Sequence, residues 1–423
     1  HENDFEPDYE HATATDPQED RRFGTRWLAQ TLPWWFAKSA MDRPPSFWAP
    51  CVAGLVVRLA AYAVCTLFLD AYSPLPLRES VDVHVYLGDA RALFSEVRPY
   101  EREFVEYPPV YFLAVLPPYL PTLLLGEASY PWCFATWMAL WEALLVWLVG
   151  RCAWEATRDA SRARLAAWAY ALSYACAGFA TTRFDGLPAA FATMAILAAM
   201  TNRGAGAAGL AATGALAKWF PGVLVAPLVL EARRSPREAL RRLASWGLVL
   251  LLGTLPIVLL SPRGFLETYR YHFRRVPNSE TTHKLLSELG ERTGLWELDP
   301  GAFTFPLLAC LIVCWLLVAL WLWRKPSPWP ARTHAAAAVA ILVPFLLGNK
   351  AFSPQFLLWV AAPFCVLART RLDWVLYFAL QGVMVVEFPL LYAYYPAPLW
   401  LGVTMGLRCL LLGCMAIRGV RRP

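Results

Sequence analysis

Long apolar runs separated by short polar segments make up most of the chain. The first run extends from about Phe47 to Leu69 and has about the 20 residues that a helix needs to cross a bilayer. Further candidate runs are 109–126, 130–150, 163–182, 187–201, 205–230, 243–260, 302–323, 335–348, 352–368, 372–392 and 398–417. The pattern predicts an all-α polytopic membrane protein with about twelve transmembrane helices, in a range of about eleven to thirteen.

Composition supports this class. Of the 423 residues, 58% are hydrophobic and 17% are charged, whereas a soluble domain usually carries about 25% charged residues. The ten cysteines lie mostly in apolar runs and show no metal-binding spacing. The net charge of +6 comes from basic residues beside the runs, so it does not indicate a nucleic-acid partner.

The chain divides into three parts. Residues 1–24 are predicted to be a disordered acidic tail, because such a segment cannot bury enough apolar surface to fold alone. Residues 25–44 contain tryptophans interleaved with basic side chains and are predicted to be an interfacial amphipathic segment. Residues 45–423 form the predicted membrane domain.

Basic residues favour the cytoplasmic side of a membrane. The basic loop 233–242, the pair Arg324 and Lys325, and the C-terminal arginines therefore predict that both termini are cytoplasmic. Two long polar loops, 71–108 and 261–301, then share the external face. Twelve full crossings would place the basic loop 151–164 outside, so either the proline-broken run VLPPYLPTLLL or the run around Lys218 is a candidate for an incomplete crossing.

The first external loop is dense in carboxylates, aromatics and arginines. Its candidate chemical groups include Asp82, His84, Asp89 and Glu106. We interpret it as an active site held just outside the bilayer. The alternative is a solvated connector, in which charged residues are expected anyway.

Charged residues inside apolar runs are costly and usually face a polar interior. Arg58, in the first run, is expected to pair with an acid such as Glu142 or to bind a lipid phosphate. Lys218 lies where Pro221 and Gly222 interrupt a run, and a broken helix at membrane depth is tolerated where it lines a cavity. Lys350, at the tip of a predicted helical hairpin, is either a ligand or a surface anchor.

The second external loop carries aromatics interleaved with bases. Within it, YHFRR contains His272, Arg274 and Arg275, and NSE follows. Beside membrane helices, such a pattern suits an anionic lipid headgroup or a sugar. An interfacial helix anchored by arginine explains it equally well.

Taken together, these motifs resemble a known family. VDVHVYLGDARAL with RPYEREFVEYPPVY is similar to the first external loop of GT-C superfamily mannosyltransferases. RFDG, ALAKWFP, YHFRR with NSE, and NKAFSPQFLLW extend the resemblance over roughly residues 47 to 370. The patterns resemble actinobacterial polyprenyl-phosphate-mannose-dependent enzymes, including those that extend phosphatidylinositol mannosides, and more distantly the first GPI mannosyltransferase.

The resemblance implies a GT-C-type helical bundle, with short interfacial helices in the external loops. It implies an inverting membrane glycosyltransferase that moves a hexose, with mannose as the first candidate. The implied donor is a polyprenyl-phosphate-sugar, and the implied acceptor is a lipid or glycolipid at the external, periplasmic face. Asp82 is the expected general base, with His84, Asp89 and Glu106 as candidates for catalytic support. The expected donor-phosphate ligands are Lys350, Lys218, His272, Arg274 and Arg275, and the substrate pocket includes Tyr86, Tyr107, Asp185 and Gln355.

We expect no cofactor and no essential metal. His84 stands where some relatives carry the second acid of an Asp-x-Asp pair, and hard cations prefer several oxygen ligands. The expected partners are the donor, the acceptor and membrane lipids. Two other functions fit the same sequence: a transporter or flippase of lipid-linked sugars, and a non-catalytic homologue that serves as a subunit of a membrane complex.

Overall fold

The computed structural model describes residues 44–69, 81–95, 99–101, 104–394 and 398–421. The predicted acidic tail and nearly all of the predicted interfacial segment lie outside the described residues. The chain divides into two compact units, His1–Pro45 and Ser46–Pro423. The second unit contains the predicted membrane domain.

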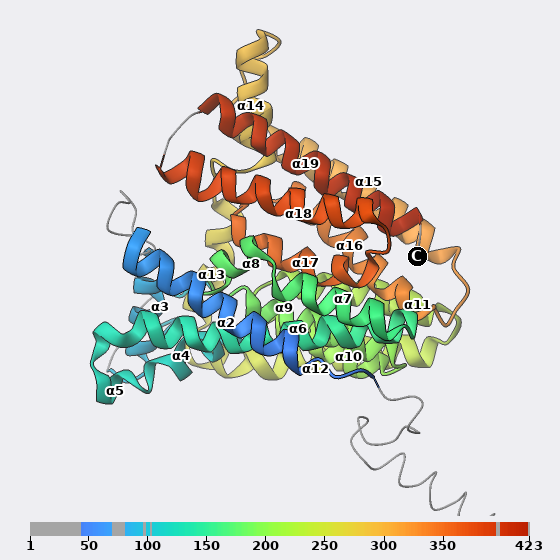
Figure 1. The fold of residues 1–423 in the computed structure, drawn as a ribbon, viewed down its shortest axis with the longest axis horizontal. Coiled ribbons are helices and arrows are strands. Elements are labelled where there is room, and N and C mark those ends of the chain that lie inside the picture. The colour runs from blue at the N-terminus through green and yellow to red at the C-terminus, as the bar shows by residue number, and fades with distance from the viewer. Residues whose placement is uncertain (1–43, 70–80, 96–98, 102–103, 395–397, 422–423) are drawn as a thin grey trace, which may run out of the picture. The chain divides into compact units, whose positions relative to one another are not determined.

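The described part of the second unit is built of helices (Figure 1). The α-helices are α2 (Trp48–Val64), α3 (Val81–Ala92), α4 (Phe112–Tyr119), α5 (Thr122–Leu125), α6 (Tyr130–Thr157), α7 (Ala160–Ala171), α8 (Tyr174–Ala180), α9 (Gly186–Met200), α10 (Gly204–Ala215), α11 (Val225–Glu231), α12 (Pro236–Leu260), α13 (Pro262–Arg274), α14 (Thr282–Thr293), α15 (Thr304–Trp323), α16 (Ala331–Leu347), α17 (Leu357–Leu367), α18 (Arg371–Val385) and α19 (Pro398–Arg421). Short 3₁₀ helices are η4 (Pro109–Tyr111), η5 (Glu127–Ser129), η6 (Phe220–Leu224), η7 (Ala232–Arg234), η8 (Pro300–Phe303) and η9 (Pro354–Phe356), and π-helical segments are η2 (Cys65–Leu69) and η10 (Val386–Tyr394).

Within the described residues, five helices are long and apolar enough to cross a membrane: Trp48–Leu67, Glu127–Thr157, Pro236–Leu260, Pro300–Trp323 and Leu399–Arg421. Four shorter apolar helices accompany them: Pro109–Leu125, Gly186–Met200, Ala331–Leu347 and Pro354–Leu367. The chain is thus a helical membrane protein, but the predicted twelve crossings are not confirmed. Several of the apolar runs are broken into helices too short to cross alone.

The proline-broken run is the clearest case. Its helices α4 and α5 have eight and four residues. At about 1.5 Å per residue, neither helix alone spans a hydrocarbon core of about 30 Å. These breaks agree with the expectation that this run does not cross fully, and the side on which the basic loop 151–164 lies stays a prediction.

Helices α12 and α15 present apolar side chains outward. Leu252 and Leu259 of α12 and Phe305 and Leu316 of α15 are all exposed. Large contiguous apolar surface is rare on soluble proteins. These two helices are therefore expected to face lipid.

The interior is formed by α6, α9, α16 and α17, and every residue of α17 is buried. A buried ion pair joins α2 to α6, because Arg58 Nε donates to Glu142 Oε2 at 2.9 Å and both side chains are fully buried. Arg58 also donates to the carbonyl of Ala171 at 2.9 Å, and the Tyr170 hydroxyl donates to Glu142 at 3.2 Å. The expected pairing of Arg58 with Glu142 is confirmed.

Replacing Arg58 with methionine is expected to lower the free energy of unfolding by about 3–5 kcal/mol, because Glu142 is left as an uncompensated buried charge. Denaturant unfolding in detergent measures the change. Arg162→Met, which removes an exposed pair with Asp159, is the control and should change stability by at most about 0.5 kcal/mol. Equal stability of the two variants would contradict a structural role for the buried pair.

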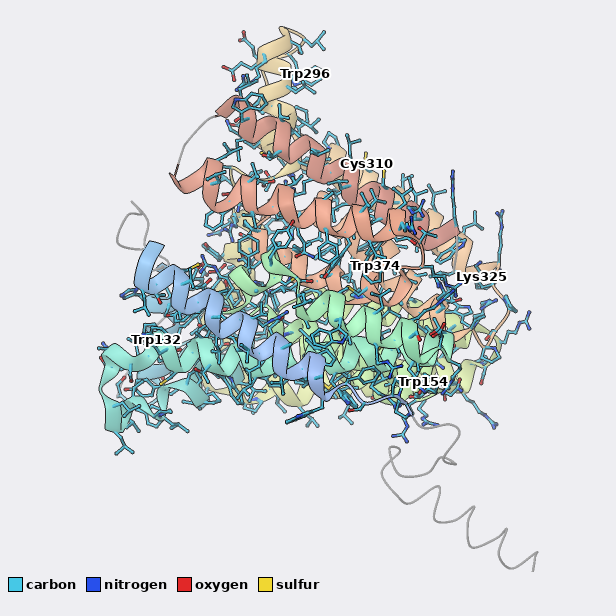
Figure 2. The ribbon with its side chains drawn as sticks, viewed as in Figure 1. Trp132, Trp154, Trp296, Cys310, Lys325 and Trp374 are labelled. Carbon is cyan, nitrogen blue, oxygen red and sulfur yellow. The ribbon has the colours of Figure 1, made fainter. Side chains whose placement is uncertain are left out.

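The two predicted external loops meet in the structure. Ser261 Oγ donates to the carbonyl of Tyr100 at 2.8 Å, and Thr268 Oγ1 donates to the carbonyl of Val105 at 2.7 Å. These contacts agree with the prediction that both loops share one face of the membrane, which stays a prediction. In Figure 2, Trp132 lies at the left of the view, where Figure 1 shows α3. Trp154 and Lys325 lie towards the right.

Candidate active site

A cavity of about 420 Å³ lies where the two loops meet the helix ends. Residues from several separate segments of the chain line it. They are Asp82, Glu106, Tyr107, Arg183, Lys218, Trp219, Phe220, His272, Arg275, Glu280, Phe345, Asn349, Ala351, Ser353, Pro354, Gln355, Phe356, Trp359 and Phe388. The volume falls within the range of about 300–1,000 Å³ that is typical of small-molecule sites.

Asp82 lies in the first turn of α3, within the predicted catalytic loop. Its Oδ2 accepts a charge-assisted contact of 2.7 Å from Arg183 Nε, and the Asp82 side chain is 41% exposed. Tyr86, one helical turn later, is buried against Tyr111, Phe134 and Phe184. This aromatic packing anchors α3, so the Asp82 carboxylate has a fixed place at the cavity wall.

Lys218 lies at the predicted break between α10 and η6, and the break is confirmed. Its Nζ lies 2.9 Å from both carboxylate oxygens of Asp185, whose side chain is fully buried. Trp359 Nε1 donates to Asp185 Oδ1 at 2.7 Å. The Lys218 ammonium also lies 4.8–5.7 Å from four ring centroids, those of Tyr107, Phe184, Phe356 and Trp359. Lys218 is thus a paired cation in an aromatic cage.

Helix α13 and the residue that follows it contribute a second group of polar side chains to the cavity wall. Arg275 lies 3.4 Å from Glu106 Oε1, and His272 Nε2 lies 3.0 Å from the Glu106 carbonyl. Because a carbonyl only accepts, Nε2 carries the proton. Burial lowers the pKa of His272 below its ordinary value of 6.5, although the Glu106 carbonyl and carboxylate raise it in part. His272 is therefore neutral near pH 7, unlike the preorganised positive charge expected from the sequence.

A buried ion pair supports one wall of the cavity. Arg408 of α19 pairs with Glu387, and both side chains are almost fully buried. The Arg408 guanidinium donates to the carbonyl of Glu280 at 2.6 Å and lies 3.8 Å from the ring centroid of Phe352. One side chain from the C-terminal helix thus holds two segments that contribute to the cavity.

Seven of the residues singled out from the sequence line the cavity: Asp82, Glu106, Tyr107, Lys218, His272, Arg275 and Gln355. Asp185 lies directly behind Lys218. Tyr86 packs in the core beneath Asp82, while Arg274 is exposed and does not line the cavity.

Three other candidates lie elsewhere. Residues two apart on a helix point to nearly opposite sides, so His84 faces a second hollow beside Glu127 and Trp132. Asp89 is buried and accepts a hydrogen bond of 2.7 Å from the Tyr111 hydroxyl. Lys350 Nζ donates to the carbonyl of Phe273 at 2.9 Å and is absent from the cavity lining, so the structure favours its anchoring role over phosphate contact.

The cavity also holds residues that received no role from the sequence pattern. Arg183 and Trp359 belong to the quoted motifs RFDG and NKAFSPQFLLW, so they could have been found there. Glu280 belongs to NSE. Phe388 lies in no motif, and its backbone is non-helical at the kink of η10.

Among the residues that the structure describes, no group of three or more His, Cys, Asp or Glu side chains is placed to hold a metal ion. Independence from metal stays a prediction.

Comparison with known proteins identifies the family. The model of glycosyltransferase family 87 matches residues 104–349, which is more than half of the chain. The match includes Lys218, Arg275 and most of the cavity lining, while Asp82 precedes it. A search of curated proteins finds no significant match. The chain is a membrane protein that belongs to glycosyltransferase family 87.

Proposed function

We propose that this glycosyltransferase moves a hexose from a polyprenyl-phosphate-sugar donor to a hydroxyl of a lipid or glycolipid acceptor. The observation that carries the proposal is the cavity, where the accessible carboxylate of Asp82 lies beside several cations and an aromatic surface. An acid and cations in one sheltered site suit the transfer of a group from a phosphate. Mannose is the first candidate because the motif order resembles that of GT-C mannosyltransferases, and a GT-C-type bundle is part of the proposal.

The proposed reaction is a single displacement. The acceptor oxygen forms a bond to the anomeric carbon as its proton passes to the Asp82 carboxylate, and the bond from that carbon to the phosphate oxygen breaks. The polyprenyl phosphate leaves with the bonding electrons. One base and one displacement invert the configuration of the anomeric carbon.

The leaving phosphate gains negative charge, so it needs positive partners more than a proton. The Arg275 guanidinium and the Lys218 ammonium are the proposed positive partners, because both side chains line the cavity. Trp219, Phe220, Phe356 and Trp359 provide apolar surface for the first isoprene unit and for the face of the sugar.

We propose the external face as the site of reaction and the cytoplasm as the side of both termini. This is supported by the basic loop 233–242 and the pair Arg324 and Lys325, which do not line the cavity. Arg233 of η7 donates to the carbonyl of Lys325 at 2.6 Å, so two of the basic loops meet.

The test is direct. Purified protein in detergent is incubated with polyprenyl-phosphate-mannose and candidate lipid acceptors, and products are identified by mass spectrometry. Glycosylated acceptor supports the proposal. Movement of intact donor across proteoliposomes without any product would support a flippase instead, and the absence of both product and movement would support a non-catalytic subunit.

Donor affinity should depend on pH through His272. Because burial lowers the pKa of His272 below 6.5, the imidazole gains charge only as the pH falls below that value, so the affinity for the anionic diester should rise as the solution is made more acidic than about pH 6.5. His272→Gln should lack this rise. A diester donor keeps its own charge constant over that range, so a rise that persists in the variant would exclude His272 as its cause.

Chelation should leave activity intact. We expect turnover to be unchanged by EDTA, because His84 replaces the second carboxylate that a hard cation would favour. Activity lost with chelator and restored by magnesium or manganese would contradict this expectation.

A further inference from the structure

The contact between Arg183 and Asp82 joins two distant segments, α3 and the turn before α9. The atoms Arg183 Nε and Asp82 Oδ2 lie 2.7 Å apart, and both residues line the cavity. While this ion pair is in place, the Asp82 oxygen that contacts Arg183 is occupied by the guanidinium. The same contact occupies the Arg183 guanidinium, which could otherwise bind a phosphate.

The backbone around Arg183 is fixed while its side chain reaches the cavity. Phe184 and Asp185, which follow it directly, are fully buried. Phe184 packs in the aromatic core, and Asp185 is held by Lys218 and Trp359. The Arg183 side chain is 19% exposed, and its Nη1 donates to the neighbouring carbonyl of Thr182 at 3.0 Å.

The other cations are less suited to changing partners. Lys218 contacts both oxygens of the fully buried Asp185 carboxylate. If Lys218 moved away, the negative charge of Asp185 would be left buried without a cation. Arg275 lies at the longer distance of 3.4 Å from Glu106, and its release would not free Asp82, the proposed base. A move of Arg183, in contrast, would both bring a guanidinium to a phosphate and free the Asp82 carboxylate. A guanidinium has five donors and matches phosphate geometry well.

We propose that Arg183 exchanges partners, from the Asp82 carboxylate to the phosphate of the lipid-linked donor, so that Asp82 is released as the base only when donor is bound. This inference rests on the proposed function and specifies how its site is regulated. It predicts that donor binds before acceptor deprotonation can begin. It also predicts that Asp82 and the donor phosphate compete for one guanidinium.

The experiment measures donor affinity in nanodiscs with polyprenyl-phosphate-mannose as the probe. Arg183→Gln should weaken binding by about tenfold or more, as expected for a lost charge-assisted contact, and Arg183→Lys should be intermediate. Asp82→Asn should tighten binding by about two- to fivefold, because it removes the competitor for Arg183. In the double variant the gain from Asp82→Asn should vanish, which a double-mutant cycle detects as coupling.

Two controls make the result specific. Arg270→Gln removes an exposed arginine that pairs with Glu267 outside the cavity, and its donor affinity should equal that of the wild type. Polyprenol without phosphate should bind the wild type and Arg183→Gln equally.

The outcomes are separable. If wild-type protein binds no polyprenyl-phosphate-sugar, the proposed function fails and the exchange fails with it. If the wild type binds donor but Arg183→Gln binds equally well, only the exchange is overturned. Weaker binding in Arg183→Gln with no gain in Asp82→Asn also overturns it, because Arg183 would then be a phosphate ligand without competition from the base.

Discussion

Replacing Asp82 with asparagine is expected to lower turnover by about 10² to 10⁴-fold, the usual effect of removing a general base. The amide keeps the shape of the side chain but cannot accept the acceptor proton. Asp82 is partly exposed in the first turn of α3, so the variant should fold normally and still bind donor. Initial rates with saturating donor and acceptor measure the loss.

Glu267→Gln is the matched control for this substitution. Glu267 is an exposed carboxylate of the second loop, outside the cavity, and its removal changes the net charge by the same amount. Near-normal turnover in Asp82→Asn would mean that another residue is the base. Glu106 would then be the first candidate, because it is the other acid of the first loop that lines the cavity. Asp89 is a weaker alternative because it is buried against Tyr111.

Replacing Lys218 with methionine is expected to destabilise the protein by about 3–5 kcal/mol and to weaken donor binding. Asp185 is fully buried and would lose the cation that contacts both of its oxygens. Its hydrogen bond from Trp359 would not compensate a full charge. Denaturant unfolding and donor titration on the same preparation measure the two effects.

Lys350→Met is the matched control, since it removes a lysine that is bonded to a backbone carbonyl outside the cavity. Its stability should change by at most about 0.5 kcal/mol. Adding Asp185→Asn to Lys218→Met should recover part of the lost stability by removing the stranded charge. A Lys350 variant that loses more donor affinity than the Lys218 variant would contradict this assignment and restore the order expected from the sequence.

The sequence predicted those features that follow from the cost of burying charge. Arg58 could not stay unpaired in an apolar run, and its partner Glu142 is one of the few acids within the other apolar runs. The break at Lys218 followed from Pro221 and Gly222. The positions of the basic residues predicted that the two polar loops share one side, and the loops do meet in the structure.

Other features depend on geometry that a single sequence does not encode. Asp82 and His84 look equivalent in a loop, but the helix α3 turns them to different sides. The direction of the Lys350 side chain depends on where the second loop packs, since its partner is the carbonyl of Phe273. The pairing of Arg183 with Asp82 joins two segments through a tertiary contact, so each residue could be noticed but their partnership could not.

The anomeric configuration of the product tests the central claim most directly. Purified wild-type protein is supplied with a polyprenyl-phosphate-mannose of defined configuration and a lipid acceptor, and the new glycosidic linkage is analysed by NMR. Single displacement with Asp82 as the base predicts a product of inverted configuration, formed by the wild type and not measurably by Asp82→Asn. A product of retained configuration, or equal product from both proteins, would contradict it.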